Sequence, residues 1–387
     1  MYDSLLREVT RKQVERKFRP ILNGNAVLTA FNFFYRLPLE DNMSPVEFSF
    51  EVTPEIIPSS NIHAIIGKNG VGKSRCFRLM VRALCEANSE NTGEFMFQDV
   101  GNCEQIANVV FVAFSAFDPF EFPIETSSKN RMCRFDYIGL AQSKRNTDTV
   151  SLKTFEELKD EFAKSLIACR ANPRHDRWVS VIKYLLDDPV FNEFEIIDMI
   201  DYKELPNSIE RLHSIFNKLS SGHKIILLTL TRLVELVDEQ TLVLIDEPEA
   251  HLHPPLLSAF MRALSFLLIT RNGISIIATH SPVVLQETPA NCVWIMSRAG
   301  KNVAIRRPTD ETFGSSVGSL TRDVFGLEVT NTGFSRMIQE MCQSCSGYNE
   351  LIDELNDHLG LEGRALARAY FSQKTLNVAN DDGDSEQ

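Results

Sequence analysis

The 387-residue chain, with 43% hydrophobic and 24% charged residues, is long enough to bury a sizeable core. Its formal net charge of -12 argues against a protein that coats nucleic acid over its whole surface. The apolar stretches are too short to span a membrane, the N-terminus opens with charged residues, and the eight cysteines follow no regular framework. We therefore expect a cytoplasmic protein without a signal peptide or membrane span.

Two clusters of basic residues are candidates for binding nucleic acid. The first lies in residues 1–24, which we predict to form a basic helical segment; its members are Arg7, Arg11, Lys12, Arg16, Lys17 and Arg19. The second surrounds a loop at Asn172 and Pro173; its members are Arg170, Arg174, His175 and Arg177. Either cluster could bind phosphates, and a solvated or partner-facing surface is the alternative.

Residues 67–74 read G-x-x-x-x-G-K-S, the pattern of a phosphate-binding loop. An apolar strand at 62–66 precedes the loop, and helical spacing of apolar residues follows it. The glycines leave room for backbone N–H groups to converge on phosphate oxygens at the positive end of the helix. Lys73 would reach the β- and γ-phosphates, and Ser74 would offer its hydroxyl to Mg²⁺. The expected nucleotide-binding residues are Gly67, Lys68, Asn69, Gly70, Val71, Gly72, Lys73, Ser74 and Arg75.

Residues 152–218 read as several amphipathic helices, which predicts an inserted helical lobe. The loop at 219–224 then starts a further helix. Ser220 is a good N-cap and Gly222 keeps the backbone open, so Ser220, Ser221 and Gly222 could hydrogen-bond a γ-phosphate. Alone, this loop indicates only a capped helix.

Two later strands end in residues suited to hydrolysis. The apolar strand at 241–248 ends in two adjacent carboxylates, Asp246, which would hold Mg²⁺ through its water shell, and Glu247. Glu247 would orient or deprotonate the attacking water. His280 follows the strand at 274–279 and could touch the γ-phosphate or that water, although a histidine after a strand can also be structural. The expected catalytic residues are Glu247, His280 and Lys73.

Two other groups have metal-ligand character. His251 and His253 lie close to Glu249, but two histidines with no third ligand evident nearby do not make a zinc site. Cys342 and Cys345 have redox or zinc spacing without a second pair in range, so a position in a helical core is the favoured interpretation.

After strands at 292–296 and 303–306, we predict a helical partner-binding segment at 311–379 and a disordered acidic tail at 380–387. This segment is too short for an acidic metal-dependent nuclease domain. Arg336, Glu340 and His358 could suit metal-independent RNA cleavage, but Arg and Glu four residues apart on a helix are usually a salt-bridged pair.

Taken in order, 67–74, 219–224, 246–247 and 279–282 resemble the ATPase head of cassette-type (ABC) and SMC-like proteins, over about residues 25–310. The resemblance implies an α/β P-loop NTPase fold of the ABC/SMC-head type, with an inserted helical lobe and a helical C-terminal segment. The run at 245–255, Ile-Asp-Glu-Pro-Glu-Ala-His-Leu-His-Pro-Pro, is typical of the branch that includes OLD-type and antiphage-defence ATPases. Within it, the chain most resembles the ATPase subunit of Septu-type systems, which work beside an HNH nuclease.

The resemblance implies that the chain binds ATP with Mg²⁺ and assembles as a homodimer or higher homo-oligomer. The loop at 219–224 would contact the nucleotide held by the opposite protomer, and a separate HNH nuclease subunit would be regulated in antiphage defence. The alternatives are an ATP-bound scaffold with little turnover, a RecF-like DNA repair ATPase, and a self-contained ribonuclease toxin.

Four positions depart from the cassette pattern. Ser221 and His223 replace a glycine and a glutamine of the signature loop, and His253 stands where an aspartate communicates across the dimer. After the strand at 108–114, either Ser115 or Asp118 takes the place of the expected glutamine at the metal shell, or no residue does. These departures predict slow hydrolysis and favour the scaffold alternative.

Overall fold

The computed structural model divides the chain into two compact units, residues 1–317 and 318–387, where the sequence suggested a boundary near residue 310. It describes residues 26–38, 45–86, 91–98, 106–115, 133–143, 150–201, 205–300, 302–326 and 333–383. The predicted basic segment at 1–24 and Asp118 lie outside these residues.

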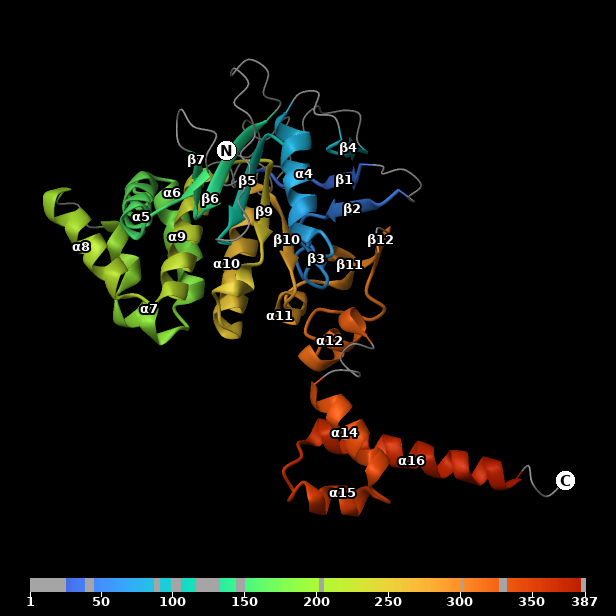
Figure 1. The fold of residues 1–387 in the computed structure, drawn as a ribbon. Helices are drawn as coiled ribbons and strands as arrows, with labels where there is room; N and C mark the ends of the chain where they lie inside the picture. The colour runs from blue at the N-terminus through green and yellow to red at the C-terminus, as the bar shows by residue number, and fades with distance from the viewer. Residues whose placement is uncertain are drawn as a thin grey trace, which may run out of the picture. The chain divides into compact units, whose positions relative to one another are not determined.

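The first unit is built on a seven-stranded sheet within the described residues, with strand order β12-β11-β3-β10-β9-β5-β6 (Figure 1). The strands are β3 (Ile62–Ile66), β5 (Asn108–Ala113), β6 (Arg134–Gly139), β9 (Thr241–Asp246), β10 (Ile274–Thr279), β11 (Val293–Ala299) and β12 (Asn302–Arg306). Only the edge pair β11 and β12 is antiparallel. The central strands are nearly continuous apolar runs because a parallel sheet is covered on both faces.

Helices cover the two faces of this sheet. Leu242 and Leu244 of β9 belong to the core beneath α4 (Lys73–Cys85), whose apolar side includes Phe77. Ile245 points the other way, toward α9 (Ser221–Leu236) and α10 (Pro254–Arg271). The alternation follows from the two-residue period of a strand. This α/β arrangement, with the phosphate loop between β3 and α4, confirms the P-loop NTPase fold.

A separate three-stranded antiparallel sheet packs on the α4 side, with order β2-β1-β4. Its strands are β1 (Phe31–Arg36), β2 (Glu47–Val52) and β4 (Glu94–Phe97). Aromatic side chains alternate along β1, so that Phe33 and Tyr35 are completely buried while their neighbours are half-buried. Phe33 lies 5.3 Å from Phe50 of β2, ring centre to ring centre. Such aromatic pairs add stability beyond their buried area.

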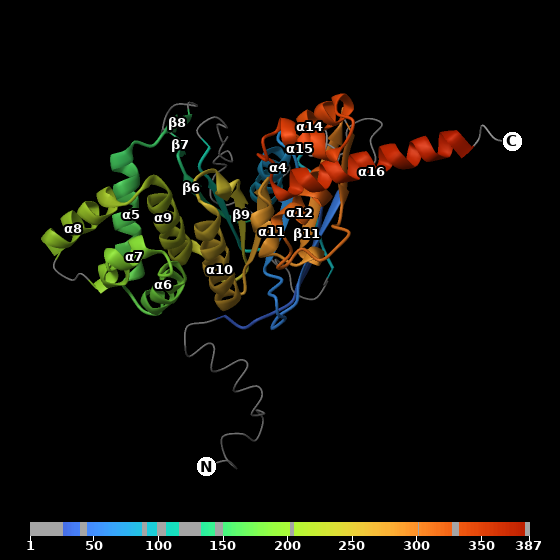
Figure 2. The same ribbon diagram turned by 90° about the horizontal axis from the view of Figure 1, so that it is seen from below.

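The helical lobe follows the small hairpin of β7 (Ala141–Ser143) and β8 (Val150–Leu152). It contains α5 (Phe155–Cys169), α6 (Arg174–Ile182), α7 (Pro189–Glu193), α8 (Leu205–Lys218) and two 3-10 turns, η2 (Lys183–Leu185) and η3 (Ile196–Asp201). These helices gather beside α9, as Figure 2 shows. Thr154 and Glu157 form a capping box that starts α5. Trp178 of α6 is fully buried and donates its indole N–H to Thr231 Oγ1 of α9 at 3.0 Å.

The described residues from 317 onward contain four helices, α12 (Val317–Phe325), α14 (Gly333–Ser344), α15 (Tyr348–Glu354) and α16 (Leu361–Gly383). Cys342 and Cys345 are buried in a small core with Ile338 and Leu351, which confirms that this cysteine pair belongs to a helical core. The predicted disorder at 380–387 is wrong as far as Gly383, because α16 extends to that residue. Extending an existing helix needs no new nucleation. None of the described helices combines the length and apolar character needed to cross a membrane.

Candidate nucleotide site

Three neighbouring parallel strands bring the predicted site residues to one edge of the sheet. Ile66 of β3 pairs with Thr279 of β10, and Ala278 pairs with Asp246 of β9. The segments that follow these strands therefore leave the sheet side by side. The phosphate loop follows β3, Glu247 follows β9 and His280 follows β10. Open parallel sheets bind ligands at this carboxyl edge.

The phosphate loop has a backbone that requires glycine. Gly70 and Gly72 have φ values of 78° and 107°, in the left-handed region that side chains disfavour. Gly67 approaches β11 so closely that an added Cβ would lie 2.2 Å from the carbonyl oxygen of Met296. The loop is thus held between α4 and β11, with Asn69 and Arg75 exposed and Lys68 half-buried. This geometry agrees with a cradle for phosphate.

Lys73 connects the loop to the second strand. Its side chain is only 3% exposed, and its ammonium group lies 3.9 Å from Glu247 Oε1. It also donates hydrogen bonds to the carbonyl oxygens of Gly67 at 2.9 Å and Lys68 at 3.1 Å. Burial lowers the pKa of Lys73, and the carboxylates of Glu247, Asp246 and Glu249 act in the opposite direction. The structure therefore brings Lys73 and Glu247 together, as the sequence predicted.

Glu247 itself has an unusual backbone, with φ 48° and ψ 59° in the left-handed region. Its amide N–H donates to the carbonyl oxygen of Ala278 at 2.9 Å, which ties it to β10. A non-glycine residue rarely adopts this conformation unless its surroundings impose it, and such residues cluster at functional sites.

A third carboxylate, Glu249, positions His280. Glu249 Oε1 accepts hydrogen bonds from Thr279 Oγ1 and from the backbone N–H of His280, both at 2.6 Å. The same Glu249 oxygen lies 3.1 Å from His280 Nδ1. Glu247 Oε1 lies 3.7 Å from this nitrogen. Because the Glu249 side chain is 7% exposed, it fixes the turn that carries His280. From the sequence, Glu249 is evident only as a neighbour of two histidines. The signal that could have located it is a carboxylate in the turn η4 (Pro248–Ala250), with a Thr-His pair at the end of the next strand.

The donors for Mg²⁺ are also at this edge. Ser74 lies in the first turn of α4 and Asp246 is the last residue of β9. A hydroxyl and a carboxylate are hard oxygen ligands, which suit Mg²⁺ beside bound phosphate. Ser115 follows β5, whose Ala113 pairs with Asp246, so it leaves the sheet at the same edge and is exposed. The residues present therefore fit the ion.

The loop at 219–224 is oriented differently. Ser220 caps α9, is exposed, and has its Oγ 2.5 Å from His223 Nδ1. A Cβ on Gly222 would lie 2.6 Å from the carbonyl oxygen of His251, so this loop packs against the turn after β9. Within the part of the chain that the structure describes, Ser220 contacts His223 and Gly222 packs against His251, and neither hydrogen-bonds the phosphate loop. The structure thus does not join this loop to the Lys73 and Glu247 group.

The two histidines after β9 have different surroundings. The ring of His251 meets the ring of Phe114 edge-on, with the centres 6.4 Å apart. His253 caps α10, and its Nε2 lies 3.7 Å from Asp188 Oδ2. The same carboxylate oxygen lies 3.2 Å from His223 Nε2. His253 therefore has possible donor groups nearby from remote parts of the chain, whereas His251 is not part of this group.

The remaining candidate groups have mainly structural contacts. Arg177 is buried, and Arg170 donates its Nε–H to the carbonyl oxygen of Ile200 at 3.0 Å. The second basic cluster is thus partly used within the lobe. In the C-terminal unit, Arg336 Nε lies 2.9 Å from Glu340 Oε1, which confirms the salt-bridged pair.

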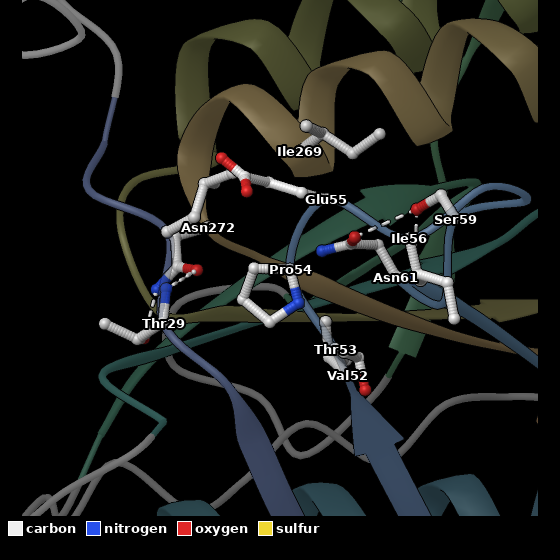
Figure 3. A pocket seen from close by; sticks show the side chains of 11 residues that line it. Thr29, Val52, Thr53, Pro54, Glu55, Ile56, Ser59, Asn61, Ile269 and Asn272 are labelled. Carbon is white, nitrogen blue, oxygen red and sulfur yellow. Dashed lines mark hydrogen bonds between the residues drawn. The ribbon is translucent and has the colours of Figure 1, made fainter. Parts of the chain in front are cut away.

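Two cavities lie at opposite edges of the sheet. One, of about 120 Å³, is lined by residues that precede β3 and β10, among them Asn61 and Asn272 (Figure 3). It is therefore away from the carboxyl edge. The other, of about 20 Å³, lies beside Asp246 and Glu247 and is lined by Thr229 of α9. Its volume suits about one water molecule.

Comparisons with known proteins found a family that matches part of this site and solved structures of low identity. The family described as "AAA domain, putative AbiEii toxin, Type IV TA system" matches residues 181–286, which include the loop at 219–224, Asp246, Glu247 and His280. Among solved structures, the chain is 13% identical to the ADP conformation of an ATP-binding cassette of an ABC transporter, covering 78% of this chain and 98% of that one with a TM-score of 0.38. The chain is 15% identical to cbiO1 from Clostridium perfringens, part of an ABC transporter complex. This match covers 81% of this chain and 99% of that one, with a TM-score of 0.37.

The fold and the grouped residues are those of a P-loop NTPase. A curated relative, protein ea59 of Escherichia phage lambda, is 40% identical over 394 residues, which cover 96% of this chain and 74% of ea59. This degree of identity over this length places the chain in the family of phage lambda protein ea59.

Proposed function

We propose that this chain hydrolyses ATP at sites completed by a second copy of itself, and that its nucleotide state controls a separate nuclease subunit in antiphage defence. The observation that carries the proposal is the convergence of Lys73, Glu247 and His280 at one strand edge. Lys73 and Glu247 are 3.9 Å apart, and His280 is 3.7 Å from the same Glu247 oxygen. The cation Lys73, the proposed general base Glu247 and the polar side chain of His280 therefore lie close together at the end of the strands.

Each residue has a distinct role in this proposal. The loop N–H groups and Lys73 hold the β- and γ-phosphates, and Glu247 accepts the proton of the attacking water. His280, fixed by Glu249, hydrogen-bonds the γ-phosphate or that water. Ser74 and Asp246 would hold Mg²⁺, which when bound neutralises phosphate charge.

The composite site rests on the loop at 219–224. Ser220 and Ser221 are exposed at the start of α9, where free N–H groups favour an anion. Their contacts within the chain do not involve the phosphate loop, so a second copy is a natural source of the phosphate they bind. Contacts made only in the closed dimer would let hydrolysis change its stability.

The partner assignment has separate support. The match to a family described as a toxin of a toxin–antitoxin system is compatible with a defence role, and the Septu resemblance suggests an HNH nuclease. On α14, Phe334 and Met337 are more than half exposed and lie three residues apart, on one helical face. We assign partner binding to this C-terminal unit.

Two variants test the site. Lys73→Ala should lower ATP affinity at least tenfold, measured by calorimetry, whereas Arg82→Ala on the same helix should not. Glu247→Gln should keep ATP binding but reduce phosphate release by about 10²–10⁴-fold, the usual contribution of a general base. Unchanged ATP affinity in Lys73→Ala would refute the site. Wild-type turnover equal to that of Glu247→Gln would support an ATP-bound scaffold instead.

The native mass tests the assembly. The chain has a mass of 43.8 kDa, so a complex expressed with its neighbouring genes and purified with ATP and Mg²⁺ should have a mass that multiples of this value cannot give. A simple multiple would mean that the chain works alone, which would favour the repair or ribonuclease alternatives.

A further inference from the structure

We propose that Asp188, His223 and His253 form a binding site for a divalent transition-metal ion, with Zn²⁺ as the expected ion. One donor atom from each residue lies within 4.8 Å of the other two. The distances from Asp188 Oδ2 are 3.2 Å to His223 Nε2 and 3.7 Å to His253 Nε2. Ligands of tetrahedral zinc with bonds near 2.1 Å lie about 3.4 Å apart, so both distances from Asp188 Oδ2 are within about 0.3 Å of the required spacing.

The three donors come from three separate segments. Asp188 precedes α7 in the helical lobe, His223 lies in the first turn of α9, and His253 precedes α10. A bound ion would therefore join the lobe, the loop at 219–224 and the turn after β9. It would act as a cross-link between segments that the backbone connects only over long distances.

Two of the ligands are already held by neighbouring groups, as metal ligands usually are. The other oxygen of Asp188, Oδ1, accepts the backbone N–H of Val190 at 2.9 Å, which leaves Oδ2 for the ion. His223 is 10% exposed, and its ring meets Phe191 edge-on with the centres 5.0 Å apart. With a metal on Nε2, its Nδ1–H can donate to Ser220 Oγ, 2.5 Å away.

His253 is the ligand that has to adjust. Its side chain is 54% exposed, and its Nδ1 accepts the N–H of Leu256 at 3.3 Å, which places the proton on Nε2. Binding through Nε2 requires this proton to leave or move to Nδ1, and the long cap bond is then given up. The exposure of the ring leaves solvent access for a fourth ligand, such as water.

The donor set selects the ion. Two imidazoles and one carboxylate suit zinc and related first-row ions, whereas Mg²⁺ prefers an octahedron of oxygen ligands. This cluster is therefore distinct from the Ser74 and Asp246 pair, and excess Mg²⁺ should not compete for it.

The test is a Zn²⁺ titration of the full chain by calorimetry, after chelator treatment and with excess Mg²⁺ but no nucleotide. We expect one ion per chain, with affinity at least tenfold weaker in both His223→Ala and His253→Ala. His251→Ala is the matched control, because this neighbouring histidine is outside the cluster, and it should bind as the wild type does. Since no nucleotide is present, the result is independent of the ATPase proposal.

Absorption of the Co²⁺-loaded protein gives a second readout. Nitrogen and oxygen ligands give visible d–d bands without the near-ultraviolet charge-transfer band of cobalt bound to thiolate, which separates this site from the cysteines. Circular dichroism identifies any variant that fails to fold. If His223→Ala does not fold, the Zn²⁺ affinity of His253→Ala tests the site, because the His253 side chain is half-exposed and its loss should leave the fold intact. Absent binding, unchanged affinity in folded His253→Ala, or a thiolate band would overturn the proposal.

Discussion

Acid should destabilise the ATPase unit through His63, a buried residue of β3 directly before the phosphate loop. The side chain is 1% exposed and its ring meets Phe50 edge-on at 5.3 Å. Burial, with a smaller contribution from the charge of Arg307, lowers the pKa of His63 from its ordinary value of 6.5 to about 3. Nearby backbone groups of Glu51 and Ser60 offset part of this shift.

The sign and size of the effect follow from linkage. Below pH 6.5 the unfolded chain takes up a proton on His63, whereas the folded chain does not until the pH approaches about 3. His63 therefore costs no stability well above pH 6.5. As the pH falls from about 6.5 toward about 3, the free energy of unfolding decreases. At pH 4.5, about two pH units below the unfolded pKa, the loss is about 2.7 kcal/mol.

The assay is urea unfolding at pH 7.5 and pH 4.5, followed by tryptophan fluorescence. Both tryptophans, Trp178 and Trp294, lie in the first unit, so the signal reports that unit alone. His63→Leu should reduce the stability difference between the two pH values by about 2.7 kcal/mol, whatever its effect at neutral pH. The exposed control His251→Leu should keep the wild-type difference. A His63→Leu protein with the full wild-type pH dependence would refute the reasoning.

Two further changes test packing around the site and the lobe. Gly67→Ala should lower ATP affinity at least tenfold in calorimetry, because its Cβ would collide with the carbonyl oxygen of Met296. Gly318→Ala is the control, because a Cβ there would meet open space. Equal ATP affinities of the two variants would contradict the close approach of Gly67 to Met296. Trp178→Phe should cost about 1–3 kcal/mol in urea unfolding followed by circular dichroism, since it leaves the buried Thr231 hydroxyl without its donor. A loss below about 0.5 kcal/mol would contradict that role.

Much of the fold and the nucleotide site could be predicted because their signals are local. The strands at 62–66 and 274–279 are found at the predicted bounds, and the one predicted at 241–248 ends two residues earlier, at Asp246. Apolar runs of this length, each followed by glycines, carboxylates or a histidine, carry both the strand and its functional end within a few residues. The parallel register then brings Lys73, Glu247 and His280 together.

The parts that were missed depend on contacts between distant residues. Glu249 and His280 are 31 positions apart, and Asp188 and His223 are 35 positions apart. No periodicity or motif shows which carboxylate will meet which ring across such distances. The C-terminal end of α16 was missed for another reason, because polar composition suggests disorder even where an existing helix continues.

The pairing of β3, β10 and β9 has a consequence for how this family can diverge. The ladder from Ile66 to Thr279 and from Ala278 to Asp246 sets the register of this edge by backbone hydrogen bonds. The long stretch between β6 and α9 enters and leaves this framework without carrying any of those pairings. Insertions and deletions in this stretch can therefore change the helical lobe while the segments after the three strands stay in register, so the lobe and this edge can evolve at different rates.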